Sequence, residues 1–405
     1  MLPISFRRAH PEDLDRLVEI HFAAYPDDRG FEARRRNFMG KPFGPFADLH
    51  VAVRDEGLPS EDLVGHAFGF GLVVGVGGRQ VPMTGIATVG VAPEARGQGV
   101  GRAIVAHVIS EGERAGAVGS FLFPFRQAFY ARLGYTSAPP VHHVPVALAA
   151  LRALGGARRR VRRAKGEDRP LLEALYRTYA HVGTGLVART ERLWTSILAD
   201  ERLVVVVLDD GEKPSGYAMF CFEQAEPHAA QRVRVTEIVG ETTACRLAVL
   251  GWLGTLSDQA TEADLEMAFD DPLLDALLDH DPNRLRPGTA RIEHALGTLG
   301  AGPMLRLASA RRALAARGYT EDGRVELDVD GERFGLLVRA GVGEVVPPGP
   351  GEVVTLTTAT LTRVAYGGAS LFRAWLAGSV RASRGAAREA DRVLSVPAFF
   401  TLDRF

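Results

Sequence analysis

The segment Thr88-Val-Gly-Val-Ala-Pro-Glu-Ala-Arg-Gly-Gln-Gly-Val-Gly-Arg102 says more about this chain than any other part of the sequence. A short β-branched run ends at Pro93, a glycine-rich turn carries Arg96, and an apolar-periodic helical pattern follows Arg102. The first backbone N–H groups of a helix have no partner within it, so a strand, a glycine-rich turn and a helix N-terminus together form an anion site. The segment therefore predicts a loop that binds an oxyanion or a pyrophosphate.

The spacing of the glycines narrows the choice of ligand. Gly97, Gly99 and Gly101 would let a pyrophosphate approach the backbone, and nearby guanidinium groups would add charge-assisted hydrogen bonds. The spacing is not Gly-x-Gly-x-x-Gly and no Gly-Lys-Ser/Thr follows, which disfavours a dinucleotide fold and a P-loop. The pattern Arg96-x-x-Gly99-x-Gly101 resembles the pyrophosphate loop of the GNAT family of acyl-CoA N-acyltransferases. The alternative is an ordinary glycine-rich connection.

The resemblance implies a binding site for acetyl-CoA, as co-substrate, along this segment. In the family, positions matching Val89 and Val91 hold the pantetheine and the thioester through their main chains. A backbone N–H of this strand can meet the thioester carbonyl as in an oxyanion hole, where one donor contributes roughly 3 to 4 kcal/mol. The residues implied in binding acetyl-CoA are Val89, Gly90, Val91, Arg96, Gly97, Gln98, Gly99, Val100, Gly101 and Arg102.

Length and composition set the class of protein. A chain of 405 residues is expected to contain two or three domains, and its 46% hydrophobic and 24% charged residues are typical of a soluble globular protein. The net charge of −1 gives no reason to expect nucleic acid or an anionic membrane as a partner. Two cysteines, Cys221 and Cys245, are too few for a disulfide framework or a cysteine-built metal site. We expect a cytoplasmic protein without a metal.

The beginning of the chain supplies candidates for binding an acceptor. A strand over 4–8 and a helix are followed by the turn Tyr25-Pro-Asp-Asp-Arg-Gly30 and a second helix over 31–38. GNAT domains also begin with two helices, and the connection between them flanks the acceptor site. The resemblance makes Tyr25, Asp27 and Asp28 candidates for holding a cationic acceptor. Acidic residues in a turn are alternatively plain turn formers.

A second signature, Phe129-Tyr-x-x-Leu-Gly-Tyr135, follows an apolar strand over 118–124. A phenol with a reference pKa of about 10 stays protonated at neutral pH and can donate to a leaving thiolate. Tyr130 falls on the family's tyrosine and is the candidate general acid. Tyr135 follows Gly134 and is expected to pack as a helix-end aromatic. Three histidines can be weighed for catalysis, and each is expected to be structural or superficial: His107, His142 and His143.

The opening pattern returns after Asp168, with two helices and then strands over 203–208, 216–222 and 233–239. This predicts a second copy of the same fold. Where the glycine loop would stand, the chain reads Gly240-Glu-Thr-Thr-Ala-Cys-Arg, without a further glycine or an arginine cluster. The second copy is therefore not expected to bind the cofactor in the same way.

The last part of the chain is expected to form a small α+β domain, beginning with an amphipathic helix over 304–319. This arrangement resembles a sterol-carrier-protein-like domain, and the whole order resembles the enhanced intracellular survival (Eis) family of acetyltransferases. The resemblance implies a mixed α/β and α+β chain of three parts: an active GNAT domain over 1–154, a degenerate GNAT-like domain over 155–290 and the sterol-carrier-like domain over 291–405.

The Eis resemblance also implies a reaction. It is acetyl transfer from acetyl-CoA to a primary amine of an aminoglycoside, polyamine or lysine-like acceptor, by direct attack in a ternary complex, in a hexamer. The C-terminal carboxylate, here that of Phe405, serves as the base. From the residues alone Phe405 is a frayed end, although the apolar Phe399 and Phe400 favour docking. The alternatives are a longer acyl-CoA donor and a catalytically silent protein that binds a lipid or another small molecule.

Overall fold

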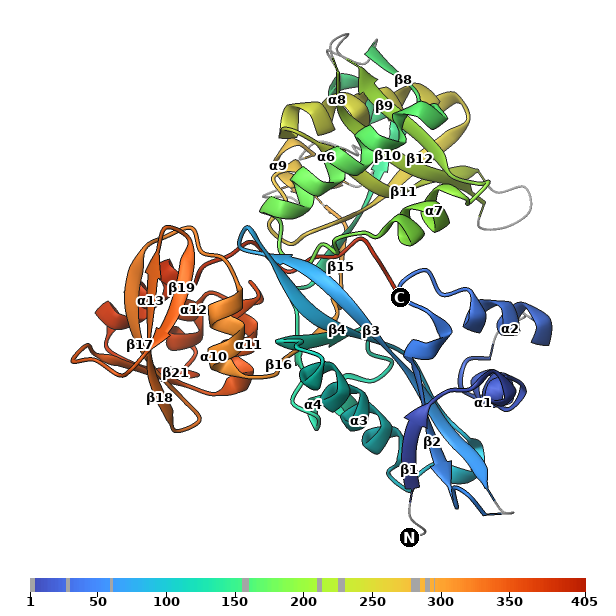
Figure 1. Cartoon of the computed structure of the whole chain (residues 1–405). Helices are drawn as coiled ribbons and strands as arrows, with labels where there is room; N and C mark the ends of the chain where they lie inside the picture. Colours follow the sequence, from blue (N-terminus) through green and yellow to red (C-terminus); the bar gives the residue numbers. More distant parts are fainter. Residues whose placement is uncertain are drawn as a thin grey trace.

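The computed structural model describes residues 4–26, 30–58, 61–154, 160–209, 213–224, 230–277, 285–287, 292–294 and 296–405. These residues form two seven-stranded mixed sheets, one five-stranded sheet and a two-stranded ribbon. Figure 1 shows the three larger sheets in three bodies, with the C-terminus lying where the first and second bodies meet. We call these bodies the first domain, the second domain and the C-terminal domain.

The first domain is a sheet with helices on both faces. Its strands, in spatial order, are β1 (Ile4–Arg8), β2 (Leu49–Arg54), β3 (Asp62–Val76), β4 (Arg79–Val91), β5 (Gly119–Leu122), β16 (Met304–Leu307) and β6 (Thr136–Ser137). Its helices are α1 (Leu14–Ala24), α2 (Phe31–Met39), α3 (Val100–Arg114) and α4 (Gln127–Ala131). The hairpin turn between β3 and β4 is formed by Gly77 and Gly78, whose φ angles of 58° and 83° match the twist of a two-residue hairpin.

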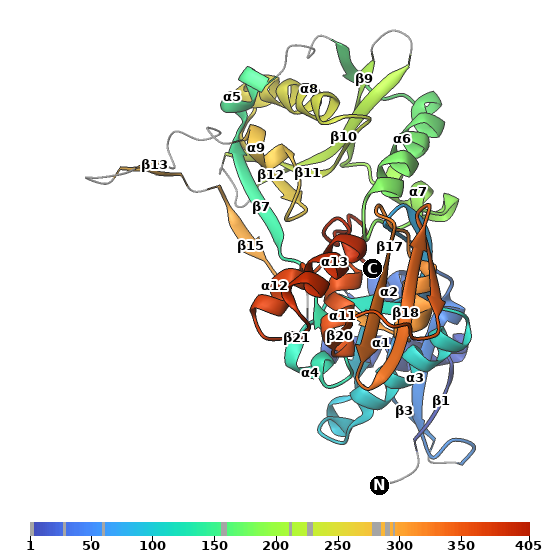
Figure 2. The same ribbon diagram turned by 90° about the vertical axis from the view of Figure 1, so that its left-hand side faces the viewer.

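The second domain repeats this plan. Its strands, in spatial order, are β15 (Thr298–Gly300), β7 (Val141–Ala147), β12 (Ala260–Met267), β11 (Gln231–Gly240), β10 (Pro214–Glu223), β9 (Val204–Asp209) and β8 (Val161–Arg163). Its helices are α5 (Leu148–Leu151), α6 (Arg169–Val182), α7 (Glu191–Leu198), α8 (Thr243–Leu253) and α9 (Leu273–Ala276). The ribbon of β13 (Leu285–Pro287) and β14 (Ile292–His294) projects from this part of the molecule (Figure 2).

The same ion pair occurs in both domains, so the repeat of the fold extends to side chains. Arg7 forms a bidentate pair with Asp13, and the same carboxylate accepts from the N–H of His10 at 2.7 Å. Arg162 forms the same pair with Asp168, whose carboxylate accepts from a backbone N–H three residues earlier, also at 2.7 Å. The six-residue spacing between strand and helix start is thus identical in both domains, as expected for two copies of one fold.

The C-terminal domain is a sheet packed against helices. Its strands, in spatial order, are β19 (Val342–Val346), β18 (Glu332–Arg339), β17 (Gly323–Val329), β20 (Val353–Leu356) and β21 (Val380–Arg381). Its helices are α10 (Ala310–Ala316), α11 (Thr358–Ala365), α12 (Leu371–Leu376) and α13 (Arg384–Leu394). Its buried apolar residues form one continuous core with those of the first domain, whereas the second domain has two clusters of its own.

The sheets do not follow the order of the chain. β7 belongs to the second sheet, although it precedes residue 154, and β16 lies between β5 and β6 in the first sheet. The predicted helix over 304–319 is therefore wrong in its first part: Met304–Leu307 is a strand, and only Ala310–Ala316 is helical. The apolar residues of this segment fit both periods, and pairing with β5 determines the outcome.

Candidate active site

A bulge interrupts the pairing of β4 with β3 where the glycine-rich segment begins, at Thr88. The register of β4 against β3 shifts between the pairs Phe68↔Ala87 and His66↔Gly90, and Thr88 has a φ of 51°. On its other side β4 pairs in parallel with β5, and this pairing ends at Ile86↔Leu122 because β5 ends there. The backbone of β4 beyond Ile86 thus diverges from its neighbour, which leaves an edge at which a ligand can pair.

The loop after β4 leads directly into α3. Gly97 and Gly99 have φ angles of 75° and 84°, a left-handed conformation that favours glycine, and a Cβ at either position would have no atom within 4 Å. The residues from Arg96 to Gly99 are exposed, and Val100, which begins α3, is buried. The loop therefore presents open backbone next to a helix N-terminus, as an anion site requires.

The polar side chains of the loop organise it. Arg96 donates to the carbonyl of Ala23 at 2.9 Å and so ties the loop to the end of α1. Gln98 donates to the carbonyl of Glu94 at 2.9 Å and accepts from Arg54 at 3.3 Å. Arg54 is a third guanidinium at the loop, beside Arg96 and Arg102. Sequence reasoning missed it because it lies on β2 and is brought to the loop by the sheet. Arg102 is exposed in the first turn of α3.

Tyr130 lies in α4, beside the diverging strands. Its side chain is buried, and its ring meets those of Phe129 and Phe125 edge to face at 4.9 and 5.6 Å. Burial and the nearby phenols of Tyr25 and Tyr135 raise the pKa of Tyr130 well above 10, so its hydroxyl stays protonated. The hydroxyl of Tyr135 forms a 2.7 Å hydrogen bond with that of Ser120 inside the core, as expected for a structural tyrosine.

Tyr25 occupies the end of α1, above the bulge. Its hydroxyl donates to the carbonyl of Val89 at 3.0 Å, so one of the predicted acceptor residues contacts the predicted cofactor strand. Burial raises the pKa of this phenol too. The other two acceptor candidates, Asp27 and Asp28, lie outside the described residues.

A buried histidine supports the bulge from behind, and sequence reasoning missed it. His66 of β3 is fully buried and stands 6.0 Å from the ring of His21 and 5.4 Å from that of Phe38. Burial and the neighbouring His21 lower the pKa of His66 to about 3, which keeps the ring neutral. A Cβ on Gly90 would lie 2.4 Å from Nε2 of His66, so glycine is required there by close packing.

Phe405, the last residue of the chain, is docked in the first domain. Its ring makes edge-to-face contacts with aromatic rings at centroid distances of 5.0 to 6.2 Å; the partners are Phe43, Phe70, Phe121 and Phe123. A Cβ on Gly85 of β4 would lie 2.9 Å from its Cζ. The C-terminal residue is thus seated against β4 and β5 just before the two strands diverge.

The three histidines expected to be structural or superficial are not part of this site. His107 of α3 forms a 3.1 Å hydrogen bond with His50 of β2, while His142 and His143 lie on β7 in the second sheet. Within the described ranges, no group of three or more histidine, cysteine, aspartate or glutamate side chains is arranged to hold a metal ion. Over the same residues, the structure contains no helix with the length and apolarity needed to span a membrane.

The corresponding place in the second domain is built differently. β11 is followed at once by α8, whose N-terminus is capped by Thr242, its hydroxyl accepting from the N–H of Cys245 at 3.2 Å. A glycine loop like that of the first domain is replaced by this side-chain cap. The first turn of α8 also carries Arg246, which is buried and paired with Asp271 at 2.7 Å.

Comparison with known proteins agrees with the presence of two copies of one fold. Residues 5–138 match one acetyltransferase (GNAT) domain family, and residues 185–307 match another. The N-acetyltransferase Eis of Mycobacterium bovis is 29% identical to this chain over 321 residues, which are 74% of this chain and 75% of that protein. The protein of the same name from Mycobacterium tuberculosis has the same identity and coverage.

Solved structures share the whole architecture. A GCN5-related N-acetyltransferase from Anabaena variabilis superposes with a TM-score of 0.82 at 22% identity, covering all of both chains. One from Kribbella flavida gives 0.80 at 24% identity, covering 100% of this chain and 99% of that one. Eis1 from Mycobacterium abscessus gives 0.74 at 21% identity, with full coverage of both. At these identities the likeness establishes the fold of the entire chain, C-terminal domain included.

Proposed function

Because the chain is an acetyl-CoA-dependent acetyltransferase that contains two tandem GNAT domains, we propose that it transfers the acetyl group to a primary amine at a single site in the first domain. The observation that carries this proposal is the meeting of three features: the diverging end of β4, the buried Tyr130, and the docked ring of Phe405. They come from distant parts of the sequence. Two contacts support the proposal that they act together: Phe405 packs against Gly85 of β4, and Tyr25, which lies near the phenol of Tyr130, bonds to Val89 further along the same strand.

The first domain has the features that acetyl-CoA needs. The open, left-handed glycines and the start of α3 would receive the pyrophosphate, and the diverging edge from Val89 to Val91 would pair with the pantetheine. Acetyl-CoA supplies the thioester that is to be cleaved. A backbone N–H on this edge would meet the carbonyl oxygen, and Tyr25 restrains the edge by its hydrogen bond to Val89.

Proton movement is assigned to two groups of this chain. Tyr130, kept protonated by burial, would donate to the departing sulfur. The α-carboxylate of Phe405 would orient the amine and take up its proton, directly or through water. An α-carboxylate has a reference pKa of about 3.5, so it becomes an effective base only where the site excludes water. The aromatic rings packed against the ring of Phe405 support the proposal that this end of the chain is held in apolar surroundings.

The acceptor class is proposed from the resemblance to the Eis family and from the carboxylate. A terminal carboxylate at the site favours a cationic amine, such as a polyamine, an aminoglycoside or a lysine-like amine. Asp27 and Asp28 would add to this attraction. We further propose a metal-free hexamer in the cytoplasm, without nucleic-acid or membrane partners, whose C-terminal domain is sterol-carrier-like. The resemblance supports the assembly and the domain, and the near-zero net charge supports the absence of polyanionic partners.

One experiment tests the reaction and its alternatives. Release of free thiol is measured with acetyl-CoA and longer acyl-CoAs against a panel of primary amines. We expect thiol release only when acetyl-CoA and a multivalent amine are both present. Faster thiol release with a longer acyl-CoA would show that this acyl-CoA, and not acetyl-CoA, is the preferred donor. If no thiol is released with any combination and a lipid binds tightly, the alternative of a catalytically silent binding protein is favoured.

A second experiment tests the base. A variant with a few residues added after Phe405 moves the α-carboxylate away and leaves the ring in the chain. We expect a large loss of kcat with unchanged affinity for acetyl-CoA, and a normal unfolding temperature as control. Full kcat in the extended, folded variant would remove the carboxylate from the mechanism.

A further inference from the structure

The tail that ends at Phe405 is held along the second domain. After α13, the N–H of Ala398 donates to the Asp270 carboxylate at 2.8 Å, and the N–H of Phe400 donates to the carbonyl of Thr184 at 2.8 Å. Arg404 pairs with Glu266 of β12 at 2.7 Å. The neighbours Phe399 and Phe400 belong to different cores, that of the first domain and that of the second. The tail thus crosses from one domain to the other within these residues.

The tail packs at the place in the second domain that corresponds to the cofactor strand of the first. β11 pairs in parallel with β12 as far as Val235↔Leu265, and beyond this point it continues like the diverging end of β4. Phe400 and Leu402 line a small hollow there together with Thr236 and Ile238 of β11. With its helix capped by Thr242 and this gap lined by the tail, the second copy holds protein where the first is proposed to hold acetyl-CoA.

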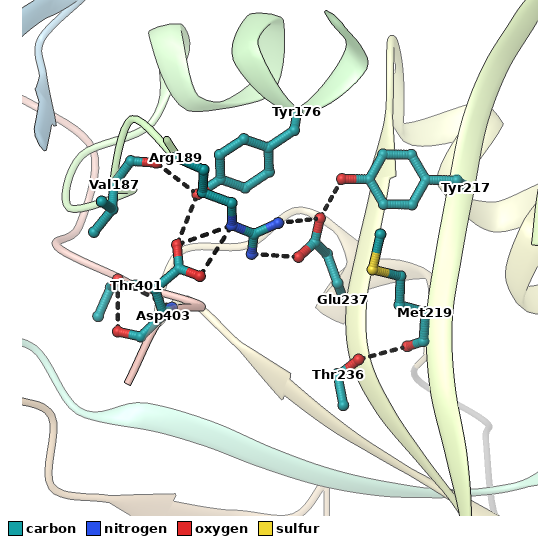
Figure 3. Close-up of polar contacts among 9 residues, drawn as sticks. All are labelled: Tyr176, Val187, Arg189, Tyr217, Met219, Thr236, Glu237, Thr401 and Asp403. Carbon is teal, nitrogen blue, oxygen red and sulfur yellow. Dashed lines mark hydrogen bonds and ion pairs between the residues drawn. The ribbon is translucent and has the colours of Figure 1, made fainter. Parts of the chain in front are cut away.

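A buried ionic cluster fixes the tail at Asp403 (Figure 3). The guanidinium of Arg189 contacts the carboxylate of Asp403 at 2.9 and 3.1 Å and that of Glu237 on β11 at 2.5 and 3.1 Å. All three side chains are 3 to 4% exposed. Tyr176 donates to Asp403 at 3.1 Å, and Tyr217 donates to Glu237.

The guanidinium of Arg189 is also packed against two aromatic rings, 3.9 Å from the ring centroid of Tyr176 and 4.9 Å from that of Trp194. The cluster therefore fixes the position of one guanidinium through two carboxylates and two rings. One of those carboxylates belongs to the tail, two residues before the chain ends. If the tail left, the buried guanidinium of Arg189 would lose the contacts of its Nε with Asp403 and keep only those with Glu237. The loss of one of two partners of a buried charge is unfavourable, which favours the docked tail.

We propose that the second domain acts as the dock for the C-terminus, and that Arg189 is a positioning residue that seats Phe405 in the first domain by holding Asp403. This assigns a role to the copy that has no glycine loop. Its catalytic consequence rests on the proposed function, in which the Phe405 carboxylate handles the amine. The docking of the tail by Arg189 does not rest on the proposed function. Docking and catalysis can be measured separately.

The test uses Asp403→Asn in the whole 405-residue chain. This change removes the tail's charge and leaves the Arg189 pair with Glu237 in place, so the second domain keeps its own contact. The control is Asp168→Asn, which neutralises another carboxylate of the second domain at the N-terminus of α6; its side chain is 8% exposed and it pairs with the more exposed Arg162. Thr401→Val is the milder second variant, because it removes only the hydroxyl that accepts from the N–H of Asp403 at 3.3 Å.

Two readouts are taken on folded protein. Carboxypeptidase A, which prefers C-terminal aromatic residues, reports by mass spectrometry how fast Phe405 is released. Steady-state kinetics report kcat and KM for the amine and for acetyl-CoA. We expect release to rise about tenfold or more in Asp403→Asn, less in Thr401→Val and not in Asp168→Asn, because cleavage follows the population of undocked tail. We expect kcat to fall by up to about 100-fold with the KM for acetyl-CoA unchanged.

The outcomes separate the two proposals. Faster release with lower kcat supports both the seating and the role of the carboxylate. Faster release with unchanged kcat supports the seating and removes the carboxylate from the proposed mechanism. Release at the wild-type rate in Asp403→Asn, or an equal rise in Asp168→Asn, overturns the assignment of Arg189 and Asp403 as the device that seats the tail.

Discussion

The hydroxyl of Tyr25 donates a 3.0 Å hydrogen bond to the main-chain carbonyl of Val89, which joins the end of the first helix to the bulged part of β4. The two residues are 64 positions apart. The contact lies where β4 has left β5 and where its backbone has one sheet neighbour, β3. It therefore restrains the strand edge proposed to meet the thioester.

Tyr25→Phe is predicted to weaken this restraint without disturbing the fold. A hydrogen bond of this kind contributes about 1 kcal/mol, so kcat/KM for acetyl-CoA is expected to fall roughly fivefold. The unfolding temperature should change little because the ring keeps its contact with His21. Steady-state kinetics at fixed amine provide the measurement. Unaltered kcat/KM would show that the strand needs no support from this phenol.

Tyr130→Phe is predicted to affect the chemical step. Removing a general acid costs about 100-fold to 10,000-fold, so kcat should fall within this range while the affinity for acetyl-CoA, measured by calorimetry, stays the same. Tyr135→Phe is the matched control: it deletes a buried phenol that bonds Ser120, and is expected to lower stability by about 1 kcal/mol with little effect on kcat. Equal losses of kcat in both variants would contradict the assignment.

Gly90→Ala is predicted to disrupt the bulge. The new Cβ would lie 2.4 Å from Nε2 of His66, whose ring is fully buried and cannot move aside freely. Overpacking of this kind typically costs about 1 to 3 kcal/mol, and affinity for acetyl-CoA should fall with the distorted strand. Gly71→Ala on β3 is the control, because a Cβ there meets nothing within 4 Å. Calorimetric titration and thermal unfolding of both variants check this.

Local sequence predicted the parts of the site that are contiguous in the chain. The glycine loop and α3 form within one segment, and Tyr130 lies in the short helix that its own signature predicts, although this helix is limited to Gln127–Ala131. These features depend on turn chemistry and on a helix start, which neighbouring residues determine. The absence of glycines after Gly240 likewise indicated that the second copy is built differently at this place.

The parts that sequence reasoning missed depend on contacts between distant segments. Nothing near His66 signals that its ring will lie behind Gly90, because burial on β3 is set by α1 and α2. Arg189 sits in a loop and acquires its role from Glu237 and from Asp403, which is 214 residues away. The strand Met304–Leu307 takes its conformation from β5. Tertiary pairing, which overrides local pattern, explains all three.

Acid is predicted to destabilise the protein through buried imidazoles. His50 is 2% exposed and 3.1 Å from His107, with Arg8, Glu111 and Arg114 nearby, and burial lowers its pKa to about 4. In the unfolded chain the reference pKa is about 6.5. Between these values the unfolded state binds more protons than the folded state, so the free energy of unfolding falls as pH falls from about 6.5 to about 4.

The loss associated with His50 amounts to roughly 3 kcal/mol over this range, since each pKa unit corresponds to about 1.4 kcal/mol. Urea unfolding at a series of pH values measures it. His50→Gln, which cannot be protonated, is expected to be less stable than the wild type at pH 7 because it disturbs the contact with His107, yet to lose less stability on acidification. His66, whose pKa is lowered to about 3, contributes in the same direction, so some acid sensitivity remains in the variant. Parallel pH profiles for wild type and variant would show that His50 is not the group responsible.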